Sequence, residues 1–270
     1  MEPTVSAQGR DRLVSSHINF DAHPIDDTAY EAQCKRVLDG QGALVLEGFF
    51  RAESIEQIVV ESLLREHEVF YAGSTHNVYL TPSDPDLPGD HPFNQQVASS
   101  KGLIADDQIP NGSPLRDVYD SAEFQAFLCA VLGIDAIYPY DDSLSSINVH
   151  FADEGRELGW HFDNSSFAVT MLLQKPDGGG SFEYVSDVRN ADAGEMGFDG
   201  VQRVLDGTAE PEVLEFEPGA LVLFRGRNSL HRVTPTVGDT TRLLTVFAYN
   251  DQPGVRLSDS ALETFFGRTA

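Results

Sequence analysis

The second half of the chain alternates between short apolar stretches and turns rich in glycine and proline, and this pattern constrains the fold most. Residues 147–151, Ile-Asn-Val-His-Phe, alternate apolar and polar side chains with the period of a β-strand that has two different faces. We expect strands at residues 145–151, 167–173, 181–185, 213–216, 220–224 and 242–249, with a short helix near 197–205. Several short strands joined by such turns predict a β-sandwich or a jelly-roll barrel.

The first half of the chain has the pattern of a support for this β-rich region. Helices are expected from an Asp27 cap to about Leu38, over 53–68 and over 114–132, with a strand at 42–50. Residues 1–26 read as a polar arm, and 72–112 as a loop or lid. We therefore expect one mainly β domain with flanking helices. The expected organisation is a helical and loop-rich buttress and lid at 1–140, a jelly-roll core at 141–252 and a C-terminal helix at 253–270.

Composition excludes several classes of partner. The net charge of -25 argues against binding to nucleic acid or to anionic membrane surfaces, which require basic footprints. This charge either keeps the surface soluble or attracts a cationic substrate. Apolar runs are too short to span a bilayer, and the N-terminus lacks a signal-peptide pattern. With only two cysteines, no disulfide framework is indicated, and we expect a cytoplasmic monomer or homodimer.

A His-Phe-Asp step at 161–163, followed by His231, predicts a metal site. In a strand, residues two apart point the same way, so His161 and Asp163 can both face the interior of a barrel. His231 follows the apolar strand at 220–224 and can supply the third ligand. Two imidazoles and one carboxylate form the ligand set of non-haem Fe(II) sites that keep positions open for substrate and oxygen. The other histidines outside the strand pattern are interpreted as structural.

Arg242 stands eleven positions after His231, in a mostly apolar strand. A buried guanidinium needs a partner, and its fork matches a carboxylate. That carboxylate either belongs to a ligand or forms a structural salt bridge. Arg225 and Arg232 are near enough in sequence to share in binding an anion. Arg232 directly follows a predicted ligand, so on a regular strand it would point away from the metal.

A family resemblance rests on three segments and the arginine that follows them. They are Gly159-Trp-His-Phe-Asp163, Pro218-Gly-Ala-Leu-Val-Leu-Phe224, Ser229-Leu-His-Arg-Val-Thr-Pro235 and Arg242. Over residues 145–250 the chain resembles the Fe(II)/2-oxoglutarate-dependent dioxygenase superfamily. Within it, the segments Phe-Arg-Gly-Arg at 224–227 and Phe-Ala-Tyr-Asn at 247–250 are similar to those of bacterial enzymes that modify free amino acids. That group contains both hydroxylases and radical halogenases.

The resemblance implies a double-stranded β-helix core, with Fe(2+) held by His161, Asp163 and His231. It also implies 2-oxoglutarate as a cosubstrate that binds iron and is gripped by Arg242, with O2 as the oxidant and succinate as a product. Halogenases of the superfamily have Gly or Ala in place of the carboxylate ligand, which leaves room for chloride. Because Asp163 is present, the resemblance implies hydroxylation of an unactivated C–H bond, although desaturation or ring formation stays open.

The sequence gives weaker indications of the residues that contact the substrate. Asn148, His150 and Asn164 are candidates because they lie next to the predicted triad, and Glu183 is a weaker one. Each can equally serve as a structural hydrogen-bonding group. We expect a small-molecule substrate, an amino acid or close derivative. The alternatives are a peptidyl or carrier-bound residue or another small secondary metabolite. Two further alternatives belong to other classes of protein. One is a cupin-like metal-binding or sensor protein without turnover, and the other is a hydrolase that uses a pair of carboxylates.

Overall fold

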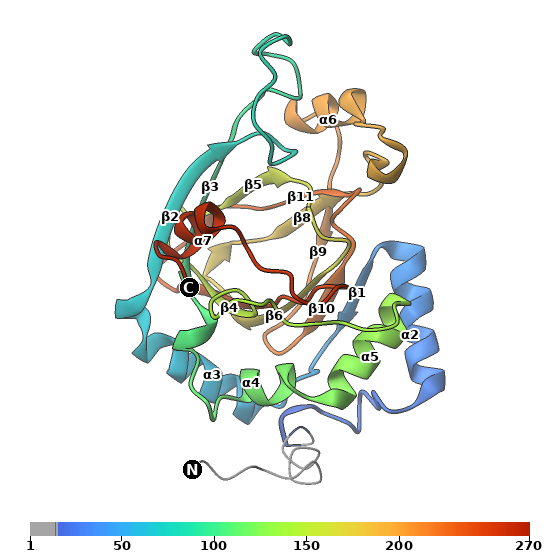
Figure 1. Cartoon of the computed structure of the whole chain (residues 1–270), viewed down its shortest axis with the longest axis vertical. Helices are drawn as coiled ribbons and strands as arrows, with labels where there is room; N and C mark the ends of the chain where they lie inside the picture. Colours follow the sequence, from blue (N-terminus) through green and yellow to red (C-terminus); the bar gives the residue numbers. More distant parts are fainter. Residues whose placement is uncertain (1–13, 15) are drawn as a thin grey trace.

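The computed structural model describes residue 14 and residues 16–270, so most of the expected arm at 1–26 lies outside the described residues. One antiparallel sheet of eleven strands curls back on itself, and its strand order is β1-β10-β6-β13-β4-β3-β5-β11-β8-β9, with β2 paired to β3 (Figure 1). The strands are β1 Ala43–Leu46, β2 Phe70–His76, β3 Val97–Ile104, β4 Ile147–Ala152, β5 Leu158–His161, β6 Ala168–Gln174, β8 Phe182–Val185, β9 Glu212–Leu214, β10 Leu221–Phe224, β11 Leu230–Val233 and β13 Arg242–Phe247. A small second sheet pairs β7 (Gly178–Gly179) with β12 (Thr236–Val237). This arrangement confirms the predicted mainly β, jelly-roll class.

Helices cover one face of the sheet (Figure 1). They are α2 Thr28–Gln41, α3 Ala52–Leu64, α4 Pro114–Tyr119 and α5 Ala122–Leu132, while α6 Phe198–Leu205 and α7 Asp259–Phe266 lie elsewhere. The predicted Asp27 cap is confirmed, because its carboxylate accepts the N–H groups of Ala29 and Tyr30. The single helix expected over 114–132 is two helices, since Ser121 caps a new one.

The expected loop at 72–112 is wrong in two segments. β2 and β3 run through it, and β3 lies at the centre of the sheet between β4 and β5. Their sequences, FYAGSTH and VASSKGLI, have no clean apolar alternation. Pairing with strands far along the chain, rather than local sequence pattern, therefore defines these two strands. The core sheet thus includes strands from the first 140 residues.

Strand register separates the two faces of the sheet. In β4, Ile147, Val149 and Phe151 are fully buried in the large hydrophobic core that the helices share. Asn148 and His150 point to the opposite, concave face, as the alternation predicted. A second cluster, which includes Trp160 and Phe162, packs behind β5 against α6. Two apolar layers thus enclose a concave face that carries polar side chains.

The described helices include none that is both long and apolar enough to cross a lipid bilayer.

Candidate metal centre

The three predicted ligands converge at one end of the curled sheet. His161 ends β5 and lies opposite His231 of β11 in the register. Asp163 follows in the next turn, where its N–H donates to the carbonyl of Gly226 at 3.1 Å. The His231 Nε2 and His161 Nε2 atoms lie 3.5 Å and 3.9 Å from Asp163 Oδ1. One ligand atom from each residue falls within 4.8 Å of the others.

Backbone hydrogen bonds fix how the two imidazoles present themselves. In each histidine the Nδ1–H group donates a hydrogen bond to the backbone carbonyl two residues earlier. His161 donates to Gly159 at 2.8 Å, and His231 donates to Ser229 at 3.0 Å. A neutral imidazole with its proton on Nδ1 has a free lone pair on Nε2. Both Nε2 atoms face Asp163, so the two rings are oriented as metal ligands.

Asp163 provides the test of whether a cation fits. Its Oδ2 atom is buried and has no hydrogen-bond partner among the described residues. Burial alone would raise the pKa of Asp163, but hydrogen bonding and charge from His231 and the charge of His161 outweigh burial and lower it. Burial and the neighbouring His231 lower the pKa of His161. An ionised carboxylate with an unmet oxygen, beside two imidazoles that each turn Nε2 toward it, is a donor set that suits a divalent iron ion.

Gly226 makes room for this triad. A Cβ atom placed there would collide with the Asp163 carboxylate and lie 2.8 Å from Cε1 of His231. The sequence reasoning did not single out this glycine, although it lies in the Phe-Arg-Gly-Arg segment. Phe182 was also missed, and its ring stacks on the His231 imidazole at 5.5 Å between centroids. Both residues restrict where the ligand side chains can move.

Arg242 lies on the concave face and is only 6% exposed. It is opposite Ala152 of β4, and its side chain contacts Gly180 beside a cavity of about 320 Å³. Burial lowers the pKa of Arg242 to about 10. Within the described part of the chain, no carboxylate comes within 4 Å of its guanidinium, so the structural salt bridge considered above is absent there.

The structure corrects the expectation for Arg225, Arg232 and Glu183. Arg232 points away from the triad, stacks over Trp160 at 4.7 Å and pairs with Glu183 at 2.7 Å. Arg225 pairs with Asp39 of α2 at 2.5 Å on the surface. Each follows or precedes a residue that faces the barrel interior, and strand alternation sends it to the other side. Arg232 and Glu183 are therefore paired with each other away from the triad, and Arg225 lies in the wall of a neighbouring cavity.

The other three predicted contacts lie on the concave face or in the lining of a cavity at its rim, and their roles in substrate binding stay predictions. Asn148 faces inward, but its amide donates to the Ser145 carbonyl at 2.7 Å. His150 also faces inward, and burial, with the charges of Lys101 and Arg242, lowers its pKa well below the usual value. Asn164 lies at the rim directly after the triad residue Asp163.

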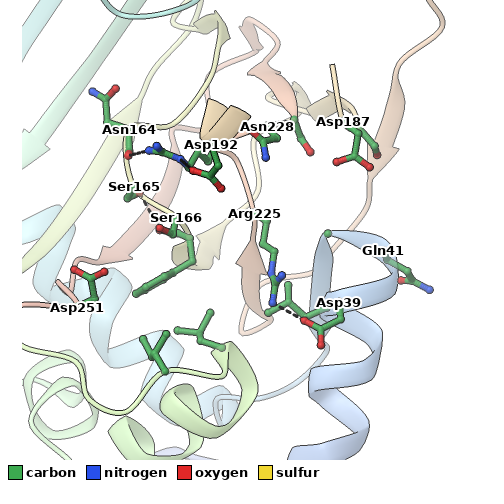
Figure 2. Close-up of a pocket in the computed structure, with 18 of the residues that line it drawn as sticks. Asp39, Gln41, Asn164, Ser165, Ser166, Asp187, Asp192, Arg225, Asn228 and Asp251 are labelled. Atoms are coloured by element: carbon green, nitrogen blue, oxygen red, sulfur yellow. Dashed lines mark hydrogen bonds and ion pairs between the residues drawn. The ribbon is translucent and has the colours of Figure 1, made fainter. Parts of the chain in front are cut away.

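A polar cavity of about 780 Å³ opens beside this rim (Figure 2). Its lining includes residues from α2, from the 164–167 loop and from the 225–229 turn. Two ion pairs lie in its wall, Arg225 with Asp39 and Arg227 with Asp192, the latter at 3.3 Å. The triad side chains themselves do not line this cavity, so we regard it as a neighbour of the metal centre rather than the centre itself.

Comparison with known proteins shows which family this chain resembles. The family model described as Halogenase D matches residues 94–264. The curated proteins give no match. Three solved structures share the fold. An oxidoreductase of the 2OG-Fe(II) oxygenase family from Burkholderia pseudomallei has 14% identity and a TM-score of 0.54, covering 84% of this chain and 93% of that one.

The second is SnoN, a non-heme alpha-ketoglutarate-dependent epimerase from nogalamycin biosynthesis, with 15% identity, a TM-score of 0.57 and coverage of 83% and 84%. The third is a prolyl-4-hydroxylase from Pseudomonas putida, with 14% identity, a TM-score of 0.50 and coverage of 80% and 96%. At these identities the three structures support the fold, and the family model spans well over half of the chain. The chain therefore belongs to the Halogenase D family and is an enzyme with the 2OG-Fe(II) oxygenase fold.

Proposed function

We propose that this protein hydroxylates an unactivated carbon of a free amino acid or close derivative, with Fe(II), 2-oxoglutarate and O2, and releases succinate. One observation carries the proposal: the His161–Asp163–His231 triad, in which His231 is buried, shares the barrel interior with Arg242, a buried guanidinium that has no carboxylate partner among the described residues. A metal-storage or sensor protein has no need of an anion site beside its metal, so Arg242 favours an enzyme.

In this proposal His161, Asp163 and His231 hold the iron. Iron with 2-oxoglutarate and oxygen supplies the oxidising power needed to break a strong C–H bond. The protein orients its own ligands: the carbonyls of Gly159 and Ser229 hold the two imidazoles, and the backbone of Gly226 holds Asp163. Such outer hydrogen bonds fix ring orientation and ligand basicity.

Arg242 is proposed to bind the distal carboxylate of 2-oxoglutarate. Its guanidinium can donate two parallel hydrogen bonds, which fixes both the position and the orientation of a carboxylate. A buried charge without a partner is costly, so the pocket is incomplete until an anion arrives. The apolar side chains of Leu244 and Val246 lie on the same face of β13 as Arg242.

Asp163 leads us to propose hydroxylation although the family is described as a halogenase family. A carboxylate ligand occupies the position that a halide would need, and Gly226 leaves the space that this carboxylate fills. Chloride would also have to lie beside the ionised Asp163, whose negative charge repels it. Replacement of Asp163 by glycine would remove both obstacles.

The amino-acid substrate is supported by the resemblance of the 224–227 and 247–250 segments and by the neighbouring cavity. Its volume of about 780 Å³ lies within the range of small-molecule sites, which is about 300–1,000 Å³. Carboxylates and guanidinium groups both line it, so it offers partners to a zwitterion. Asn164 connects the cavity rim to the triad.

A product analysis tests this proposal. The protein is incubated with Fe(II), 2-oxoglutarate, O2 and chloride against a panel of free amino acids, and succinate and product masses are measured. We expect one amino acid to stimulate succinate release and to gain one oxygen atom. A chlorinated product would contradict the role assigned to Asp163. Turnover with peptidyl or carrier-bound residues but with no free amino acid would contradict the substrate assignment.

Asp163→Gly is the matched variant for this experiment. We expect weaker iron binding and loss of hydroxylation, because one of three ligands is gone. Unchanged hydroxylation by Asp163→Gly would remove Asp163 from the triad.

A further inference from the structure

Lys101 lies on the concave face of the sheet, although the proposed function has not used it. In β3, Leu103 is opposite His150 and Gly102 is opposite Phe151. Because side chains alternate along a strand, Lys101 shares the face of Leu103 and His150, while Phe151 packs on the helix side. The sequence reasoning missed Lys101 because β3 was not recognised as a strand.

Strand register brings Lys101 into line with Arg242. Gly102 is opposite Phe151, so Lys101 is opposite Ala152 on one side of β4. Arg242 is opposite Ala152 on the other side. The two cations therefore occupy the same row of the concave face, separated by one strand. Their charges both reach His150, whose pKa they help to lower.

Lys101 differs from the other two lysines of the chain in having no carboxylate partner. Lys35 pairs with Asp39 at 3.1 Å, and Lys175 pairs with Glu217 at 2.5 Å. For Lys101 the described residues provide no carboxylate within 4 Å, and its ammonium lies 5.6 Å from the centre of the Phe265 ring. Burial lowers the pKa of Lys101 to about 8, and the charge of Asp163 opposes that effect.

The C-terminal helix α7 covers this region. Leu262 and Phe266 pack against Leu103 in one hydrophobic cluster. Two hydrogen bonds between Arg268 and Asp107, at 2.6 Å and 2.9 Å, attach the end of the chain. This cover limits access of water to the ammonium, and a poorly hydrated cation binds an anion more strongly than an exposed one.

A count of charges indicates what Lys101 can bind, and this step rests on the proposed function. With iron bound, Fe(II), Arg242 and Lys101 would bring four positive charges to the interior. Asp163 and 2-oxoglutarate would supply three negative charges. The two histidine ligands would bind as neutral imidazoles, and the low pKa of His150 keeps it uncharged. One positive charge is left over. A substrate with a carboxylate would balance it.

We propose that the ammonium of Lys101 binds a carboxylate inside the barrel, that of the substrate or the second carboxylate of 2-oxoglutarate. The row that it shares with Arg242 allows either source. The charge count favours the substrate, because in the proposed function Arg242 and the iron would already hold the two ends of 2-oxoglutarate. Lys101 would then select substrates that carry a carboxylate.

Spectroscopic titration of Lys101→Met tests this assignment without depending on turnover. Fe(II)-loaded protein is titrated anaerobically with 2-oxoglutarate, and its charge-transfer absorption gives a Kd. Free amino acids and the corresponding amines without a carboxylate are then added, and the perturbation of that absorption is recorded. Lys101→Arg, which keeps the charge, and Lys175→Met, which removes an exposed lysine, serve as controls. Thermal unfolding verifies that each variant is folded.

Two results support the proposal and identify the source. If 2-oxoglutarate is the partner, Lys101→Met raises its Kd about tenfold to a hundredfold, the range expected for a lost charge-assisted hydrogen bond. If the substrate is the partner, the Kd of 2-oxoglutarate stays unchanged and the response to amino acids is weakened by a similar factor. Wild-type protein should respond to amino acids more strongly than to the amines.

Two results would overturn the proposal, and a third would contradict the proposed function instead. A folded Lys101→Met protein that equals wild type in its Kd for 2-oxoglutarate and in its response to the panel overturns the proposal. Equal responses of wild-type protein to amino acids and amines, together with an unchanged Kd in the variant, overturn it as well. Failure of wild-type protein to develop the absorption with 2-oxoglutarate would instead contradict the proposed function itself.

Discussion

The two faces of β4 and β13 differ in what they contribute. On the helix side, Ile147, Phe151 and Phe247 are almost completely buried in apolar contacts. On the concave side, at alternate positions of the same two strands, His150 and Arg242 present ionisable groups to the interior. Burial of the apolar face stabilises the fold, whereas burial of charged groups on the concave face is unfavourable for stability. Neighbouring residues on one strand should therefore respond to substitution in opposite ways.

The largest effect on stability is expected from Phe151→Ala. Phe151 is 0% exposed, and its removal leaves a cavity in the core. The free energy of unfolding should fall by about 3–5 kcal/mol. Denaturant unfolding followed by circular dichroism measures it, with the exposed Val213→Ala as control. A loss similar to that of the control would contradict the role of this face.

Arg242→Met should have the opposite profile. We expect the Kd of 2-oxoglutarate to rise about tenfold to a hundredfold, since a charged hydrogen-bonding partner is lost. Stability should stay the same or increase, because a buried charge without a protein partner is removed. Parallel ligand titration and unfolding curves test both expectations. A strongly destabilised variant that still binds 2-oxoglutarate normally would show that Arg242 is structural.

Gly226→Ala tests whether the tight approach behind the triad matters. The added methyl group would displace Asp163 or His231, so iron affinity should fall by about tenfold or more. Iron titration of the folded protein measures this loss. Gly40→Ala in α2 is the matched control, because no atom lies within 4 Å of its added Cβ. Equal iron affinity in the two variants would contradict the packing argument.

Arg225→Ala should have the smallest effect. Its ion pair with Asp39 is exposed, and such pairs contribute about 0–1 kcal/mol. The Kd of 2-oxoglutarate should match that of wild type in the titration used for Arg242→Met. A tenfold loss of affinity would restore Arg225 to the cosubstrate site.

The sequence predicted the parts of the site that depend on local geometry. Strand alternation and the spacing from His161 to Asp163 and His231 were sufficient to name a triad that the structure brings together, while the role of Arg242 stays a prediction. The same alternation would have excluded Arg232, whose position directly after His231 sends it to the outer face.

The parts that depend on distant pairing could not be predicted in this way. β3 is a strand because β2, β4 and β5 pair with it, so Lys101 gained its place from strands distant in the sequence. Gly226 matters only because Asp163, far earlier in the sequence, lies against it. Arg225 and Glu183 found partners that are also far away in the sequence, Asp39 and Arg232.

The most direct measurement is an anaerobic titration of wild-type protein and His231→Ala with Fe(II) and 2-oxoglutarate. His231 is buried, and its Nε2 atom faces Asp163. We predict a visible metal-to-ligand charge-transfer band in wild-type protein and its loss in His231→Ala, with both proteins folded. No such band in wild-type protein, or an unchanged band in the variant, would contradict the assignment of this triad as the iron and 2-oxoglutarate site.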